Sequence, residues 1–133
     1  MSADPGTSTD PAARRAAAQA ISNGMTKLHR EHYGRGPDSV RTVHGHDHVI
    51  CFLENLYTPV ERTLLEAGEA AAVRETRQAF QRAMEDRFTE MVEGITGRKV
   101  RAFLSQVTFE PDISVEVFVL EPDTSDPAPE GIA

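Results

Sequence analysis

The sequence predicts an α+β fold of two layers, in which helices pack on a four-stranded, mainly antiparallel sheet. Two kinds of segment carry this prediction. Two pairs of extended apolar segments, each joined by turn-forming residues, predict β-hairpins in residues 40–54 and 100–120. Three segments with apolar residues at helical spacing predict helices in residues 10–33, 59–66 and 69–96. The expected order is α-β-β-α-α-β-β, without an internal repeat.

The first helix is expected to begin at Asp10-Pro11, because an N-cap side chain followed by proline is a frequent helix start. Its apolar side chains form only a narrow stripe, which indicates a packing seam rather than a fully buried face. The stripe consists of Ala17, Ile21, Met25, Leu28 and the ring of His32. Gly34-Arg35-Gly36-Pro37 then ends the helix and leads into the first hairpin.

The first hairpin has its turn at Gly45-His46-Asp47, and its return strand runs from His48 to Glu54. That return strand is apolar on both of its faces. One face carries Val49, Cys51 and Leu53, and the other carries Ile50 and Phe52. Because a strand covered on one side alternates more cleanly, the sequence predicts a sheet that is buried on both sides.

A capping box marks the start of the next helix. Thr58 is a favoured N-cap, Pro59 fits the first helical position, and Glu61 follows three residues after the cap. This helix is expected to run to about Glu66, with a break or kink at Gly68.

The long helix is expected from Glu69 to Thr96, with Gly97 as its C-cap. Arg77 lies on its otherwise apolar face, so its guanidinium is expected to pair with a buried acid or to meet a ligand. The other residues on that face are Val73, Phe80, Met84, Phe88, Met91 and Ile95.

The last hairpin pairs residues 100–109 with 113–120 across a short turn. We assign Ile50, Phe52, Phe118 and Leu120 to one face of the sheet, and Cys51, Val115 and Val117 to the opposite face. The long helix can cover one face only. The other needs either the N-terminal helix or a second copy of the chain, and the narrow stripe on that helix favours a homodimer.

Length and composition indicate one soluble domain, at residues 10–120, between a disordered N-terminus at 1–9 and a disordered acidic tail at 121–133.

The net charge is −7, but residues 10–120 hold 16 acids and 14 bases, so the folded part is near neutral and no nucleic acid is expected as a partner. No apolar run is long enough to insert into a membrane. The single Cys51 lies in an apolar strand and cannot form a disulfide within the chain. A cytoplasmic location is therefore the default expectation.

Four stretches of the chain resemble a bacterial family first catalogued as a domain of unknown function and named for MpsC, a component of a Na⁺-translocating, membrane-potential-generating system. These stretches are Gly34-Arg35-Gly36-Pro37, Leu56-Tyr57-Thr58-Pro59-Val60-Glu61-Arg62-Thr63-Leu64, Thr96-Gly97-Arg98-Lys99-Val100 with Phe103-Leu104-Ser105, and Val115-Glu116-Val117-Phe118-Val119-Leu120. The resemblance spans residues 20–120. It implies a small accessory protein of ion-translocating membrane machinery, with no catalytic residues to carry over.

The residues themselves suggest two weak candidate sites. His44, His46 and His48 alternate along the first hairpin and could bind a metal, but Gly45 and Asp47 place them in a turn, where a shared face is lost, so a solvated turn is favoured. The loop amides of Gly34 and Gly36 could bind an anion, with Arg35, Arg74 and Arg98 as its cations.

The sequence contains no nucleophile paired with a base, no phosphate-binding loop with lysine and no cysteine motif. We therefore expect a protein that is not an enzyme, needs no cofactor, and acts through contacts with itself or with a membrane complex. The alternative is a small-molecule or anion sensor that uses the loop Gly34–Pro37. Thr58, Pro59, Glu61 and Gly97 are expected to be structural.

Overall fold

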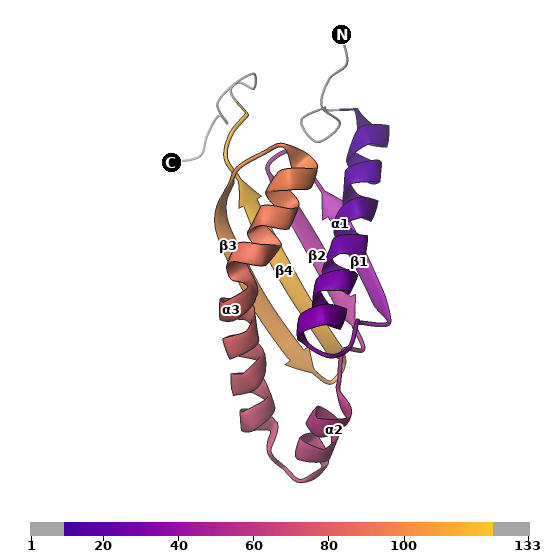
Figure 1. Ribbon diagram of the computed structural model, residues 1–133, viewed down its shortest axis with the longest axis vertical. Helices are drawn as coiled ribbons and strands as arrows, with labels where there is room; N and C mark the ends of the chain where they lie inside the picture. Colours follow the sequence, from indigo (N-terminus) through magenta and orange to yellow (C-terminus); the bar gives the residue numbers. More distant parts are fainter. Residues whose placement is uncertain (1–9, 124–133) are drawn as a thin grey trace.

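The computed structural model describes residues 10–123, and the segments 1–9 and 124–133 lie outside the described residues. The elements follow the order predicted from the sequence, α-β-β-α-α-β-β, and form an α+β fold (Figure 1). They are α1 (Pro11–His32), β1 (Ser39–His44), β2 (His48–Glu54), α2 (Pro59–Glu66), α3 (Ala70–Thr96), β3 (Val100–Phe109) and β4 (Asp112–Leu120).

The helix ends lie where the sequence predicts them. Asp10 caps α1 by accepting a hydrogen bond from the backbone N–H of Ala12 at 3.2 Å. The predicted capping box is complete, since Glu61 N–H donates to Thr58 Oγ1 at 3.1 Å and Thr58 N–H donates to Glu61 Oε1 at 3.0 Å. Gly97 ends α3 with φ of 68°, the left-handed conformation that favours glycine.

The four strands form one antiparallel sheet in the order β1-β2-β4-β3, so β2 and β4 are its central strands. The register pairs Cys51 with Glu116 and Val49 with Phe118. Residues paired across two strands share a face of the sheet. The predicted assignment of faces was therefore wrong: Phe118 and Leu120 lie on the same face as Cys51.

The opposite face carries Ile50 and Phe52 together with the odd-numbered residues of β4 from Ile113 to Val119. The sequence pattern had given the alternation within each strand correctly. It could not give the register between β2 and β4, because a shift of one residue exchanges the two faces.

Both long helices pack on the same face of the sheet (Figure 1). α1 packs against β1, α3 packs against β3, and the two helices also contact each other. Gly24 permits this close approach, because a Cβ at that position would stand 2.8 Å from the sulfur of Met91. The N-terminal helix therefore does not cover the second face, which removes one of the two covers considered from the sequence.

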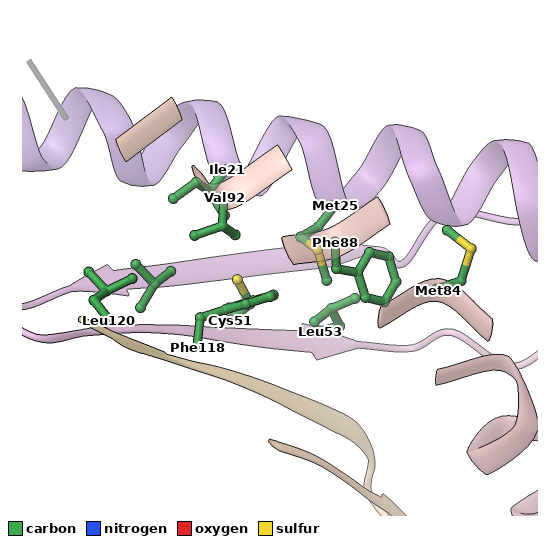
Figure 2. Packing of buried hydrophobic residues seen from close by; sticks show 10 residues of the cluster. Ile21, Met25, Cys51, Leu53, Met84, Phe88, Val92, Phe118 and Leu120 are labelled. Carbon is green, nitrogen blue, oxygen red and sulfur yellow. The ribbon is translucent and has the colours of Figure 1, made fainter. Parts of the chain in front are cut away.

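The core lies between this helical layer and the inner face of the sheet. Figure 2 shows side chains of both helices meeting those of β2 and β4. The labelled members of the cluster are Ile21, Met25, Cys51, Leu53, Met84, Phe88, Val92, Phe118 and Leu120. Each is 2% exposed or less, and Leu28, Phe80, Met91 and Ile95 of the predicted helix stripes pack against the cluster from its margins. The prediction was wrong for His32, whose ring is exposed, whereas His29 one turn earlier is buried.

The outer face of the sheet is apolar at its centre, and no helix of residues 10–123 packs on it. Toward its edges it carries polar side chains, among them Arg41, whose guanidinium lies 4.3 Å from the centre of the Phe52 ring, and Gln106 of β3. Its central side chains are half-buried by their neighbours in the sheet, and Leu104 and Val43 near its edges are 56% and 41% exposed. We call this surface the open face. Its central residues are Ile50, Phe52, Ile113, Val115, Val117 and Val119.

Candidate functional site

The most heavily hydrogen-bonded buried side chain is Arg77 of α3, which is 2% exposed. Its Nε and Nη2 donate to the two carboxylate oxygens of Glu61 at 2.9 and 3.1 Å, a bidentate arrangement. Its Nη1 donates to Asp112 Oδ1 at 3.1 Å. The expectation that Arg77 pairs with a buried acid is confirmed, and the structure supplies two acids.

The remaining oxygen positions of both carboxylates are also occupied. The hydroxyl of Tyr33 donates to Glu61 Oε2, and the backbone N–H groups of Leu56 and Tyr57 donate to Asp112 Oδ2 at 2.6 and 2.8 Å. We call this set the Arg77 network. It joins the end of α1, the start of α2, the first third of α3 and the start of β4.

Electrostatics keep the Arg77 network ionised. Burial by itself would raise the pKa of Glu61, but hydrogen bonds from Arg77, Tyr33 and Thr58 lower it below the ordinary value. Burial opposes the charge on Arg77, yet Glu61 and Asp112 raise the pKa of its guanidinium. Burial and the neighbouring Glu61 raise the pKa of the Tyr33 hydroxyl. Every polar group in the network is committed to another, so it acts as a structural junction.

A second polar cluster lies in the middle of the inner face, around Glu116 of β4. Glu116 is 1% exposed and is paired in register with Cys51 of β2 and Ser105 of β3. Gln81 of α3 donates to its Oε1 across 3.5 Å, a long hydrogen bond. Among residues 10–123, neither Glu116 Oε2 nor Ser105 Oγ has a partner in normal hydrogen-bond geometry, although the Ser105 hydroxyl is close enough to the carboxyl to lower its pKa.

Burial raises the pKa of Glu116 to about 8, and the nearby Ser105 hydroxyl and Gln81 amide lower it only in part. Burial likewise raises the pKa of the neighbouring Cys51 thiol to about 11. A buried carboxyl with an unpartnered oxygen is costly for a fold and is uncommon, so the Glu116 cluster is the stronger candidate for a functional site.

A cavity of about 240 Å³ opens on the solvent side of this cluster, between α3 and β3. Gln81 and Ser105, which neighbour Glu116, form part of its wall, whereas Glu116 itself does not line it. The other lining residues are Gln78, Arg82, Glu85 and Phe103.

The residues proposed from the sequence for an anion site are not gathered in one place. Arg35 donates to the carbonyl oxygens of Tyr57 and Asn55 at 2.9 and 3.1 Å and pairs with Asp38, so its guanidinium holds the loop Gly34–Pro37 against the end of β2. Gly34 takes a φ of 84° there, a conformation that favours glycine, and Gly36 follows Arg35 in the same loop.

The other two arginines of that proposal lie elsewhere. The guanidinium of Arg74 lies 4.8 Å from the centre of the Phe109 ring. Arg98 donates to the carbonyl oxygens of His46 and Glu121, which lie at the opposite end of the sheet from Arg35. A single anion could not contact all three side chains.

The three histidines of the first hairpin also face different partners. His44 Nδ1 lies 2.8 Å from the carbonyl oxygen of Gly45, and His48 Nδ1 lies 2.9 Å from Asp47 Oδ1. His46 Nδ1 lies 3.5 Å from Arg14. Within residues 10–123, no three histidine, cysteine or acidic side chains are placed to hold a metal ion together.

Sequence reasoning missed two of the buried acids. It assigned Asp112 to the turn, whereas its carboxylate is 3% exposed and holds both Arg77 and the backbone before α2. It also passed over Glu116, although the alternation of β4 carried a signal. Glu116 shares its parity with Phe118 and Leu120, which identifies a carboxyl in line with core residues.

These features define a small α+β protein whose helices cover one face of an antiparallel sheet and whose other face is apolar. In the part of the chain from 10 to 123, no helix combines the length and the apolar composition needed to cross a bilayer.

Comparison with known families shows to which family this chain belongs. Residues 13–122 match the model of the family described as "Na+-translocating membrane potential-generating system (MpsC)", and the chain belongs to that family. It is similar to the protein YbcI of Bacillus subtilis (strain 168), described as uncharacterized, with 28% identity over 101 residues that cover 75% of this chain and 82% of YbcI. No solved structure matches the chain.

Proposed function

We propose that this protein is a non-enzymatic, cytoplasmic accessory or regulatory component associated with a Na⁺-translocating, membrane-potential-generating system. Its membership of the MpsC family supports the association with such a system. The charged side chains of the Arg77 network are all engaged with one another, which supports a role in holding the fold rather than in chemistry. The protein then acts through its surfaces.

The observation that carries this proposal is the open face. The central strand β2 is apolar on both sides, as is typical of sheets covered on both sides, and here the helices cover one side only. Large apolar patches on a protein surface mark sites of association. We propose that two copies of the chain pack these faces together as a homodimer, since closed pairs are the commonest oligomers.

The register of the sheet decides which substitution tests the dimer. Phe118 is 0% exposed in the core, so a charge there would unfold the chain. Val117 is on the open face, and Val117→Asp places a charge in the proposed interface without entering the core. Ala83→Asp, on the exposed surface of α3, is the matched control.

Light scattering across a range of concentrations measures the outcome. The wild-type chain and Ala83→Asp are expected to give twice the chain mass of 14.6 kDa, and Val117→Asp is expected to give a single chain mass with unchanged helical content. A wild-type mass of 14.6 kDa at all micromolar concentrations would refute the dimer.

The association with a membrane system needs a separate experiment. A tagged chain is expressed in its native host, and the membrane fraction is solubilised and captured through the tag. Recovery of ion-translocating membrane subunits with the wild-type chain supports the proposal. Their absence from the wild-type capture contradicts it, whatever the result for the dimer.

A further inference from the structure

The Glu116 cluster combines an unpaired buried acid with neighbouring oxygen donors. Glu116 Oε2 and Ser105 Oγ lie on adjacent strands in register, are shielded from solvent and find no hydrogen-bond partner among residues 10–123. Buried polar atoms are nearly always partnered, by protein, by water or by an ion. Two buried oxygens on paired residues that lack a hydrogen bond of normal geometry therefore indicate a site that a small guest can complete.

The third side chain of the cluster can also supply an oxygen. Gln81 contacts Glu116 through its amide nitrogen at 3.5 Å, too long for a strong hydrogen bond. The two ends of a glutamine amide exchange places by rotation about its last bond. A rotated Gln81 presents its carbonyl oxygen to the same space, so that β4, β3 and α3 each contribute one oxygen.

The charge and the type of these donors select the guest. Carboxylate, hydroxyl and amide oxygens are the ligands of hard cations, whereas thiolate and imidazole suit zinc and copper. The cluster holds a single acid, and a buried site is most stable when its charges balance. A monovalent cation balances one carboxylate, whereas a divalent cation leaves a net positive charge in the core.

The cavity between α3 and β3 gives this cluster a connection to solvent. Its volume of about 240 Å³ holds several water molecules, and its wall includes Gln81 and Ser105. Arg82 and Glu85 line the same cavity, so one positive and one negative side chain stand in it. Movement of the Gln81 side chain would open the cluster to the cavity, and waters there can complete the coordination of an ion.

We propose that Glu116, Ser105 and Gln81 form a binding site for a monovalent metal cation, entered from the cavity between α3 and β3. The site is a property of the isolated chain, so it stands or falls independently of the proposed association with a membrane system. Cation binding supplies the partner that Glu116 Oε2 and Ser105 Oγ lack, and it joins α3 to the two strands beneath it.

Thermal unfolding of the full chain tests the site. It is measured in NaCl, KCl and choline chloride at equal ionic strength, in buffer alkaline enough to ionise Glu116, whose pKa is about 8. A cation that binds only the folded state raises the melting temperature with its concentration. We expect the wild-type chain to melt several degrees higher in NaCl than in choline chloride, because the choline cation is too large to enter the site.

Variants separate this site from general salt effects. Glu116→Gln keeps the shape of the side chain and is expected to abolish the difference between NaCl and choline chloride, whereas Glu75→Gln, on the exposed surface of α3 and outside the cavity, is expected to keep it. Ser105→Ala, which removes one ligand, should weaken Na⁺ binding about tenfold or more. ²³Na NMR line broadening by the wild-type chain, lost in Glu116→Gln, gives a direct readout.

Equal melting temperatures of the wild-type chain in the three salts, or no ²³Na line broadening, would overturn the proposal. A salt difference that survives in Glu116→Gln would also overturn it, because the ion would then bind elsewhere. If Glu116→Gln fails to fold, Ser105→Ala alone decides, since unchanged Na⁺ binding in that variant contradicts the assigned ligands.

Discussion

Removal of the Arg77 guanidinium is expected to destabilise this fold more than any surface substitution. In Arg77→Met the apolar stem is largely kept, but two hydrogen bonds to Glu61 and one to Asp112 are lost. Both carboxylates are at most 5% exposed, so they remain buried with their negative charges uncompensated. Breaking a buried ion pair by removing one partner costs about 3–5 kcal/mol.

That magnitude is large compared with the total stability of a domain, which is about 5–15 kcal/mol. Urea unfolding followed by circular dichroism measures it as a shift of the midpoint at constant slope. Arg74→Met, one turn earlier on α3, is the matched control, because Arg74 is exposed and contacts only the Phe109 ring among the interactions described for it. Its loss should cost about 0.5–1 kcal/mol.

A double variant shows whether buried charge is the cause. Glu61→Gln added to Arg77→Met removes one of the uncompensated charges, so it should recover part of the lost stability rather than add a further loss. Equal unfolding free energies for Arg77→Met and Arg74→Met would refute the reasoning. So would strict additivity of the Arg77 and Glu61 substitutions, because it would mean that the two side chains do not interact.

Two further predictions concern local stability. Thr58→Ala removes the hydroxyl that accepts from Glu61 N–H and should cost about 1 kcal/mol in urea unfolding; a variant as stable as wild type would show that the cap contributes nothing. Burial lowers the pKa of His29 below its ordinary value of 6.5, so the unfolded chain binds a proton more readily and the folded protein should lose stability as the pH falls through that range. Urea midpoints near neutral and at mildly acidic pH measure this loss of stability. The loss should shrink in His29→Gln and persist in a variant of the exposed His32. Equal pH dependence in both variants would contradict the assignment to His29.

The sequence by itself determined the elements of this protein and their order. Helix ends are set by local chemistry, such as the hydroxyl of Thr58, the ring of Pro59 and the missing Cβ of Gly97, and these effects act within one turn of helix. Alternation along each strand is equally local, and it correctly separated odd from even positions in β4. Arg77 on an apolar helix face was likewise enough to predict a buried acid as its partner.

Only the tertiary structure decided which strand faces meet and which side chains share a site. The pairing of Cys51 with Glu116 depends on contacts more than sixty residues apart, and a shift of one residue would have placed Phe118 outside the core. The same pairing brings Glu116, Ser105 and Gln81 together from three elements. Periodicity records which side of its own element a residue occupies, but the energy of burying that side depends on what packs against it. Which side becomes buried therefore depends on the whole chain, because the two helices can cover only one face of the sheet.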